Sequence, residues 1–312
     1  MPTVAATTLL DRAGPRRADE AWLKAHVADP RTRFLLLVDL KPVIISGPDR
    51  SASQLRWLSG REVGALGLPV SDAMFLGIDA ENVAHFALSI TDHLARATSD
   101  AVQFLRPAVD LRSLAMQGAL TPEELSLAGQ ARALAQWHEN ARCCGRCGST
   151  LLTKDGGWRK KCWGCGLDSF PRTDPVVIML VTDGNRCILA HEYRYAEKMW
   201  STLAGFLEPG EDIEHAVRRE VLEETSIRVG KVAYHSSQPW PFPHSLMLGC
   251  VGHAETTEIH IDKNEIAEAR WFSREEAQMM LEHSHPEGLT APGPHAIANA
   301  LIRSFVEQKL PG

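Results

Sequence analysis

Four of the seven cysteines form two C-x-x-C pairs, and these pairs constrain the fold more than any other feature. Cys144 and Cys147 form the first pair, Cys162 and Cys165 the second, and a glycine follows each pair. Two such pairs on separate hairpins can place four thiolates at the corners of a tetrahedron, the geometry that structural zinc prefers. A redox-active C-x-x-C needs only one pair, so we interpret the segment as a zinc ribbon. Cys143 could replace Cys144, although its spacing to Cys147 is less suitable.

The placement of the cysteines and the apolar runs limits the class of protein. Tight pairs, in place of a spread framework of disulfides, indicate a reducing compartment. The longest apolar runs, which begin at Phe34 and Val176, are far shorter than the roughly 20 residues of a membrane span. The first residues carry their charges after the apolar part, which is not the order of a secretory signal. The sequence therefore predicts a soluble cytoplasmic protein without a membrane partner.

The charge balance bears on nucleic-acid binding. A net charge of -6 excludes a strongly basic protein that binds nucleic acid through bulk electrostatics, but not a local basic patch. The cysteine-rich segment contains four such basic residues: Arg146, Arg159, Lys160 and Lys161. They fit a nucleic-acid surface on the ribbon and fit equally a solvated hairpin that keeps the ribbon soluble. The sequence leaves both interpretations open.

The 312 residues are long enough for more than one domain, and the patterning divides them into three parts. Residues 1–120 mix strand-like runs with short helical stretches, which predicts an α+β domain. The strand-like runs are residues 34–38, 43–45, 74–78 and 85–88. Residues 121–170 hold a connector helix, opened by a capping box of Thr121 and Glu124, and then the ribbon. Residues 171–312 begin with the strand at Val176 and are expected to form a further α/β domain.

The most informative segment runs from Gly205 to Ile227 and reads GFLEPGEDIEHAVRREVLEETSI. In a helix that starts near Asp212, one side is apolar and should face a core: Ile213, Ala216 and Val217. Glu220, Glu223 and Glu224 continue on that same side, whereas a solvated cluster would lie opposite it.

Three neighbouring carboxylates repel one another, and their partial burial costs more still unless cations compensate. Oxygen ligands at this density suit Mg²⁺ or Mn²⁺, which also hold phosphate oxygens. The preceding loop has glycines at 205 and 210, so its backbone can turn tightly and approach a metal or phosphate closely. Glu211 could orient the start of the helix, and Arg219 could pair with a neighbouring glutamate. An ordinary surface helix is the alternative.

This segment resembles the Nudix box, G-x5-E-x7-R-E-U-x-E-E-x-G-U, in which U is aliphatic. The matching positions are Gly205, Glu211, Arg219, Glu220, Val221, Glu223, Glu224 and Ile227. Ser226 stands where the pattern has glycine, so we expect a strained or remodelled turn after the helix. The resemblance implies a Nudix hydrolase with an α/β/α sandwich fold, which uses divalent metals to split a diphosphate linked to another moiety.

A proline-rich segment, SQPWPFPHSLM, follows the box at Ser237 to Met247. Its three prolines alternate around Trp240 and Phe242, which predicts a rigid, extended wall that could stack a flat ring. Gln238 and Ser245 could supply hydrogen bonds to that ring. A strand edge packed on the core is the alternative.

This segment, at this distance after the box, resembles the NADH pyrophosphatase subfamily, which also has a zinc ribbon and an N-terminal domain before the Nudix domain. The resemblance implies a homodimer that cleaves NAD(H) to AMP and nicotinamide mononucleotide and, as in bacterial members, removes the NAD cap from RNA. One alternative is a Nudix hydrolase of ADP-ribose or dinucleoside polyphosphates. Another is a zinc-ribbon regulator that binds nucleic acid and whose Nudix domain only senses a nucleotide.

The same resemblance implies roles for individual residues. Glu220, Glu223 and Glu224 would be catalytic and bind Mg²⁺ or Mn²⁺, and Glu223 or Glu224, or the metals themselves, would prepare the attacking water. Further metal ligands would be the backbone carbonyl of Ala204 and the carboxylate of Glu265. The predicted substrate contacts are Arg112, Phe170, Gln238, Pro239, Trp240, Pro241, Phe242, Pro243, His244, Ser245 and Ala298. Phe170 stands where the subfamily often has tyrosine, so it could stack on a ring but not donate a hydrogen bond.

Overall fold

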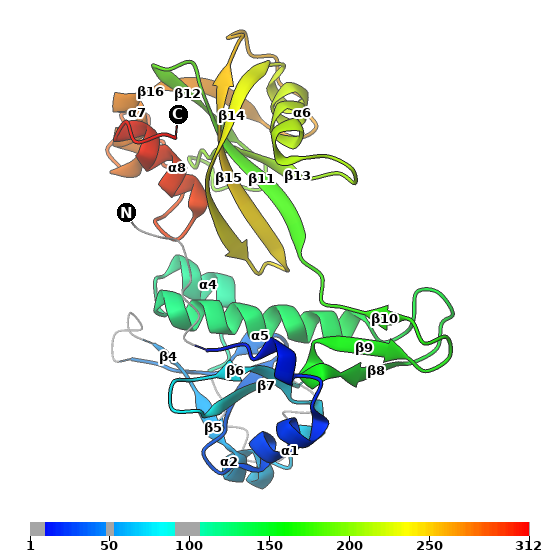
Figure 1. The fold of residues 1–312 in the computed structure, drawn as a ribbon. Coiled ribbons are helices and arrows are strands. Elements are labelled where there is room, and N and C mark those ends of the chain that lie inside the picture. Colours follow the sequence, from blue (N-terminus) through cyan, green and yellow to red (C-terminus); the bar gives the residue numbers. More distant parts are fainter. Residues whose placement is uncertain (1–9, 48–52, 91–106, 312) are drawn as a thin grey trace. The chain divides into compact units, whose positions relative to one another are not determined.

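The computed structural model of the chain describes residues 10–47, 53–90 and 107–311 (Figure 1). These residues form two compact units, each described by itself below. The N-terminal unit comprises the described residues up to Arg172 together with Pro241–His244, and the C-terminal unit comprises Thr173–Trp240 and the described residues from Ser245 onward. The first unit therefore includes the connector helix and the ribbon; the predicted division into three domains stays a prediction.

The N-terminal unit is built on a mixed sheet with the strand order β2-β1-β7-β6, in which β5 also pairs with β1. Its strands are β1 (Arg33–Val38), β2 (Lys41–Pro42), β5 (Trp57–Ser59), β6 (Met74–Ile78) and β7 (Ala84–Ile90). A separate pair is formed by β3 (Ile44–Ile45) and β4 (Gln54–Leu55). The helices are α1 (Glu20–Ala28), α2 (Gly60–Ala65), α4 (Leu111–Met116) and α5 (Pro122–Asn140). The expected α+β character of this part is confirmed.

Helix α5 begins where the sequence predicts it. Thr121 Oγ1 accepts a hydrogen bond from the Glu124 backbone N–H, and the Glu124 side chain accepts one from the Thr121 N–H, so the capping box is present. The helix ends at Asn140. Its buried Leu127 and Leu134 belong to one apolar cluster with the sheet.

The cysteine-rich segment forms a small antiparallel sheet in the order β10-β9-β8. Its strands are β8 (Leu151–Lys154), β9 (Arg159–Cys162) and β10 (Asp168–Ser169). The two C-x-x-C pairs lie before β8 and at the end of β9, so each hairpin end contributes two cysteines, as a zinc ribbon requires.

The C-terminal unit has a sheet in the order β14-β15-β11-β12-β16, with β13 also paired to β11. Its strands are β11 (Asp174–Thr182), β12 (Arg186–His191), β13 (Leu203–Phe206), β14 (Val229–Trp240), β15 (Ser245–Ala254) and β16 (Glu268–Ser273). Its helices are α6 (Ile213–Thr225), α7 (Arg274–Leu281) and α8 (Ile297–Val306). Figure 1 shows α6 on one side of this sheet and α7 and α8 on the other.

Strand β11 explains why this unit has three layers. Its side chains alternate, so Val177 and Met179 pack in the cluster that contains α6, whereas Ile178 and Leu180 pack in the cluster that contains α7 and α8. A strand covered on both faces needs an uninterrupted apolar run, which the sequence has at Val176. The predicted α/β/α sandwich is confirmed. Among the described residues, no helix combines the length and apolarity that crossing a bilayer requires.

Candidate active site

The loop from β13 into α6 positions the three glutamates. The Asp212 side chain caps α6 by accepting a hydrogen bond from the His215 N–H, so the helix starts where the sequence predicts. Further along the helix, Glu220 and Glu224 lie on the inner side of α6 and are only 9% and 8% exposed. Glu223, between them, has a side chain that is 55% exposed. The predicted burial therefore holds for two of the three carboxylates.

Glycine at position 205 makes room for one of these carboxylates. A Cβ atom built on Gly205 would lie 1.9 Å from Glu220 Cδ and 2.0 Å from Oε1, distances at which atoms overlap. Gly205 lies on β13, which pairs with β11 at the centre of the sheet. The carboxylate of Glu220 can therefore lie against the strand only because residue 205 has no side chain.

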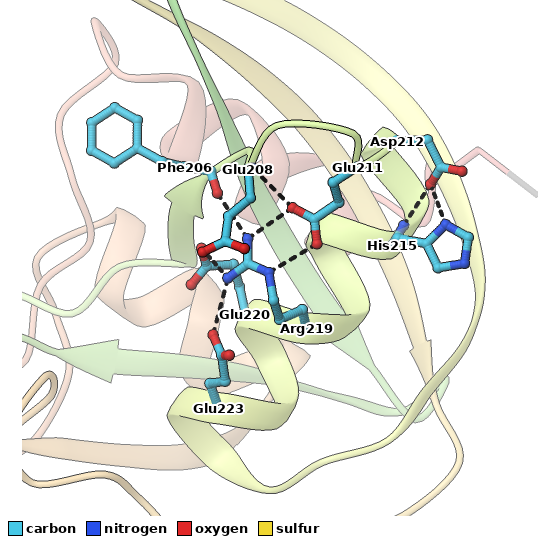
Figure 2. A network of polar contacts seen from close by, with 8 residues as sticks. All are labelled: Phe206, Glu208, Glu211, Asp212, His215, Arg219, Glu220 and Glu223. Carbon is cyan, nitrogen blue, oxygen red and sulfur yellow. Dashed lines mark hydrogen bonds and ion pairs between the residues drawn. The ribbon is translucent and has the colours of Figure 1, made fainter.

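Arg219 joins the loop and the helix through a network of ion pairs (Figure 2). Its Nε and Nη2 donate to the two carboxylate oxygens of Glu211 at 2.8 and 2.9 Å. Its Nη1 donates to Glu220 at 2.9 Å and to Glu223 at 3.0 Å. Nη2 also donates to the Phe206 carbonyl at 2.8 Å. These contacts engage all five N–H groups that an arginine has. They raise the pKa of Arg219 and lower that of Glu211.

A cavity of about 460 Å³ opens beside the inner glutamates. Its lining residues are Glu192, Tyr193, Arg194, Ala204, Gly205, Phe206, Glu208, Arg219, Glu220, Glu224 and Glu265. Four of the five predicted ligands of the catalytic metal are thus brought to one cavity, and Glu223 is the one that is not among the lining residues. Glu265 reaches the cavity from the segment before β16.

The buried carboxylates of this cavity are in an environment that disfavours their charge. Glu224 Oε2 is buried without a hydrogen-bond partner. Burial raises the pKa of Glu224 to about 8, and the negative charges of Glu220, Glu192 and Glu265 act in the same direction. Burial also raises the pKa of Glu220. An unpaired buried carboxylate is costly unless a proton or a cation compensates it, so the donor set fits a divalent cation.

Several residues at this cavity carried no signal that the sequence reasoning used. Glu192, Tyr193 and Arg194 follow β12, and only the folding of that strand beside the others brings them to the cavity. Arg194 Nε lies 2.6 Å from Glu192 Oε2, and the Tyr195 hydroxyl donates to Glu192 Oε1. Phe206 is different, because it directly follows Gly205 in the box, so its place at the cavity is predictable from the sequence. Its side chain is 59% exposed at the cavity.

The four ribbon cysteines also form a compact group of metal-ligating atoms. The Sγ atoms of Cys144, Cys147, Cys162 and Cys165 all lie within 4.8 Å of one another, and the described residues contain no second group of three or more ligands this close. The separations are 3.7 Å from Cys144 to Cys165 and 3.4 Å from Cys147 to Cys162. Tetrahedral Zn–S bonds of about 2.3 Å place sulfur atoms about 3.8 Å apart, so the cluster fits zinc. Cys143 is exposed and lies outside the cluster.

Comparison with known proteins finds family matches in both units. Residues 172–291 match the NUDIX domain, and residues 31–137 match the NADH pyrophosphatase-like rudimentary NUDIX domain. The NAD-capped RNA hydrolase NUDT12 of Macaca fascicularis is 36% identical over 338 residues, which cover 96% of this chain and 72% of the relative. The NAD-capped RNA hydrolase NudC of Mycobacterium bovis is 35% identical over 309 residues, which cover 95% and 94%.

The chain belongs to the Nudix hydrolase family. Its Nudix domain lies in the C-terminal unit, and the helix with the three glutamates is α6 of that unit. The match of residues 31–137 adds what the sequence reasoning missed, since the N-terminal α+β part is itself a rudimentary Nudix domain. Both units contain a parallel pair of strands, β1 with β7 and β11 with β15.

The proline-rich segment of this Nudix hydrolase is divided between the two units. Gln238 belongs to β14 of the Nudix domain, and its side chain is engaged with backbone: Nε2 donates to the His295 carbonyl at 2.7 Å, and Oε1 accepts from the Ile297 N–H at 2.8 Å. The buried amide of Gln238 thus holds the start of α8. A direct contact from Gln238 to substrate stays a prediction.

Pro241–His244 form part of the N-terminal unit. A Cβ atom on Gly129 of α5 would lie 2.9 Å from Pro241 Cγ, so the proline ring packs closely on this helix. Arg132, also on α5, donates to the carbonyls of Pro241 and Pro243, and its guanidinium lies 5.7 Å from the centre of the Phe242 ring. Phe242 itself packs against the core of that unit. Packing of Pro241 and Phe242 on the N-terminal unit is closer to the alternative, a segment packed on the core, than to an exposed wall that stacks a flat ring.

The remaining predicted substrate residues belong to several different elements of the two units. Trp240 and Ser245 are paired at the end of the β14–β15 hairpin, with Pro239 opposite Leu246. Phe170 is 61% exposed just after β10, and Arg112 is exposed on α4. Ala298 is buried in the first turn of α8. The substrate roles of these residues stay predictions.

Proposed function

We propose that this Nudix hydrolase cleaves the diphosphate of NAD(H) to AMP and nicotinamide mononucleotide and removes the NAD cap from the 5′ end of RNA. The observation that carries the proposal is the buried Glu224 oxygen without a partner, in a cavity shared with Glu220 and Glu265. The choice of substrate is supported by relatives named NAD-capped RNA hydrolase that are 35–36% identical over most of the chain.

The ligands of the catalytic Mg²⁺ or Mn²⁺ would be Glu220, Glu223, Glu224, Glu265 and the backbone carbonyl of Ala204. When bound, divalent ions neutralise phosphate oxygens and lower the pKa of a water molecule. Arg219 holds Glu220 and Glu223 in place, because one nitrogen donates to both carboxylates. Glu223 or Glu224, or the metals themselves, would prepare the attacking water.

Arg219 has no N–H group left to contact the diphosphate. The five N–H groups of Arg219 are already engaged with carboxylates and a carbonyl. Arg194 is the other arginine of the cavity lining, and its side chain is 75% exposed with an ion pair to Glu192 through Nε. We assign Arg194 the role of contacting the phosphate oxygens, with Glu192 holding its guanidinium.

Two exposed aromatic side chains at the cavity could hold the flat rings of a dinucleotide. Phe206 is 59% and Tyr193 is 66% exposed, and both are lining residues. Large exposed aromatic surfaces stack favourably on flat rings, which would orient the diphosphate toward the glutamates. The proposed roles of Phe170, Trp240 and Phe242 in substrate binding are additional and need their own tests.

The ribbon cysteines would hold a structural Zn²⁺, since four protein thiolates leave no open coordination position. A homodimer and a cytoplasmic location are further parts of the proposal.

The substrate proposal is tested by measuring kcat/KM for NADH, NAD-capped RNA, ADP-ribose and a dinucleoside polyphosphate with one preparation. We expect the two NAD-containing substrates to be preferred. A clear preference for ADP-ribose or the polyphosphate would favour the alternative Nudix activity, and nucleotide binding without turnover would favour a sensor. Performing the reaction in heavy-oxygen water assigns the phosphorus that is attacked, because the label enters only that product.

A further inference from the structure

The inner face of the zinc ribbon is fixed to helix α5. On strand β9, Lys160 and Cys162 are buried. The Lys160 ammonium donates to the backbone carbonyls of His138 at 3.0 Å and Ala141 at 2.7 Å, at the C-terminal end of α5. It thereby satisfies carbonyls that the helix leaves open. Lys160 therefore has a structural role and is not available to a ligand.

The opposite face of the ribbon is exposed and carries a different set of residues. Side chains alternate along a strand, so Arg159 and Lys161 of β9 lie on the face away from Lys160. Trp163 follows β9 directly, in the turn that leads to Cys165. Lys161 is exposed, and Trp163, whose backbone N–H donates to the Thr150 carbonyl, has an exposed fraction of 80%. That is the largest exposed fraction among the large hydrophobic side chains of the described residues.

The ribbon is cationic, although the whole chain has a net charge of -6. Residues 142–172 contain seven lysines and arginines but only two acidic residues, Asp155 and Asp168. Both aspartates pair with Arg159, at 2.7 and 2.8 Å. A zinc ion with four thiolates would add two negative charges and leave the segment positive. A surface of this sign attracts a phosphate backbone.

The two cysteine knuckles bring a further exposed cation to the same end of the ribbon as Trp163. A Cβ atom on Gly164 would lie 2.3 Å from Ser149 Oγ and 3.6 Å from Cys147 Sγ, so the two knuckles are in contact. Arg146 is exposed in the first knuckle, and Trp163 is exposed in the second. An exposed indole with cations beside it is the combination that binds single-stranded nucleic acid, since any base can stack on it.

We propose that the outer face of the ribbon, formed by Arg146, Lys161 and Trp163, binds the single-stranded RNA that follows the capped nucleotide. Trp163 stacks on a base, and the two cations contact phosphates. The choice of RNA as the strand rests on the proposed removal of the NAD cap. Of the four basic residues that the sequence singled out, Arg159 and Lys160 are engaged within the fold, so the proposal assigns the phosphate contacts to the exposed Arg146 and Lys161.

Binding is tested by fluorescence anisotropy with a short, uncapped, 5′-labelled single-stranded RNA and the full chain. We expect Trp163→Ala to raise Kd about tenfold and Trp163→Phe to recover most of the loss, because stacking on an aromatic ring is worth roughly 1–3 kcal/mol per base. The double variant R146A/K161A should reduce the slope of log Kd against log salt by about 1.4. Lys41→Ala, a change at an exposed lysine on β2, is the matched control and should bind like the wild type. Wild-type affinity in Trp163→Ala would overturn the proposal.

Turnover separates this proposal from the proposed function. We expect Trp163→Ala to lower kcat/KM for NAD-capped RNA about tenfold and to leave kcat/KM for NADH unchanged. If the wild type cleaves neither substrate, the proposed function fails, while the anisotropy result still decides whether the ribbon binds RNA. If Trp163→Ala changes the sedimentation of the protein and not its RNA affinity, the face is an interface between copies of the chain and the proposal is wrong.

Discussion

The carboxylate of Glu220 occupies the space that a side chain at residue 205 would need, with only 1.9 Å between its Cδ and a Cβ atom built on Gly205. This contact explains in physical terms why the box begins with glycine. The strand β13 and the helix α6 approach each other so closely that a buried carboxylate fits between them only without a Cβ. Gly205 is therefore part of the geometry of the active site.

Gly205→Ala should displace the Glu220 carboxylate and disturb its ion pair with Arg219. We expect kcat for NADH to fall at least tenfold, since misplacing a catalytic group by about 1 Å can cost up to about a hundredfold. Steady-state kinetics and circular dichroism of the variant measure this. Gly64→Ala is the control, because a Cβ there has no neighbour within 4 Å and activity should persist. Full activity in Gly205→Ala would show that the Glu220 position is not essential.

Glu224 makes the stability of the metal-free protein depend on pH. Its pKa is raised to about 8 in the folded protein, from 4.5 in the absence of these surroundings. The folded state binds this proton more tightly than the unfolded chain does. Its contribution to the free energy of unfolding is therefore fully present below pH 4.5 and is lost as the pH rises from there to about 8. Glutamine carries no charge and avoids this loss.

Glu224→Gln should therefore melt several degrees above the wild type near pH 9 without divalent metal, and the difference should shrink to nothing near pH 4.5. Addition of Mn²⁺ should raise the Tm of the wild type more than that of the variant, because the variant lacks one anionic ligand. Differential scanning calorimetry measures both effects. Glu214→Gln, an exposed change on the same helix, should leave the Tm nearly unchanged. Identical melting of wild type and Glu224→Gln at high pH would contradict this account of burial.

Arg194→Ala should lower kcat/KM for NADH by about 10- to 100-fold, the size expected for loss of a charge-assisted contact to phosphate. Arg194→Lys should recover part of the activity, because lysine keeps the charge but not the fork of donors. Kinetics with Mn²⁺ titration separate the effect from metal binding, which should stay as in the wild type. Arg228→Ala, at an exposed arginine outside the cavity lining, serves as the control. Unchanged kcat/KM in Arg194→Ala would remove Arg194 from the site.

Cys162→Ser should reduce the zinc content per chain and lower the Tm, because it replaces one of the four clustered thiols. The main effect should be on stability, and kcat/KM for NADH should change little in the molecules that remain folded. Zinc analysis by mass spectrometry and thermal unfolding check these expectations. Cys143→Ser should keep the full zinc content, since Cys143 lies outside the cluster. Retention of zinc and of the wild-type Tm by Cys162→Ser would contradict a structural zinc site.

Elements with a local signal could be predicted from the sequence. The capping residues Thr121 and Asp212 fix the starts of α5 and α6, and Met74–Ile78 is a strand with the bounds that its apolar run indicates. The expected turn after α6 is also present, as Ser226 adopts a left-handed conformation with φ of 60° and its hydroxyl donates to the His260 carbonyl. Glycine is the usual residue in this conformation, so serine makes the turn at some cost in strain.

Contacts between distant parts of the chain could not be read from local patterns. Local patterns indicate no partner for the Gln238 amide, yet its Oε1 accepts a hydrogen bond from the backbone N–H of Ile297, which is 59 residues away. The close packing of Pro241 on Gly129 likewise depends on tertiary structure. Arg194 reaches the cavity through the fold of β12 and the loop after it, and no spacing rule for the box includes it.

The most direct test of the central claim is a product analysis of NADH incubated with Mg²⁺ or Mn²⁺, for the wild type and for Glu224→Gln. We expect equal amounts of AMP and reduced nicotinamide mononucleotide from the wild type, none without divalent metal, and at least a thousandfold slower formation by the variant at unchanged zinc content. Wild-type turnover by Glu224→Gln, or formation of both products in the presence of a chelator, would contradict this claim.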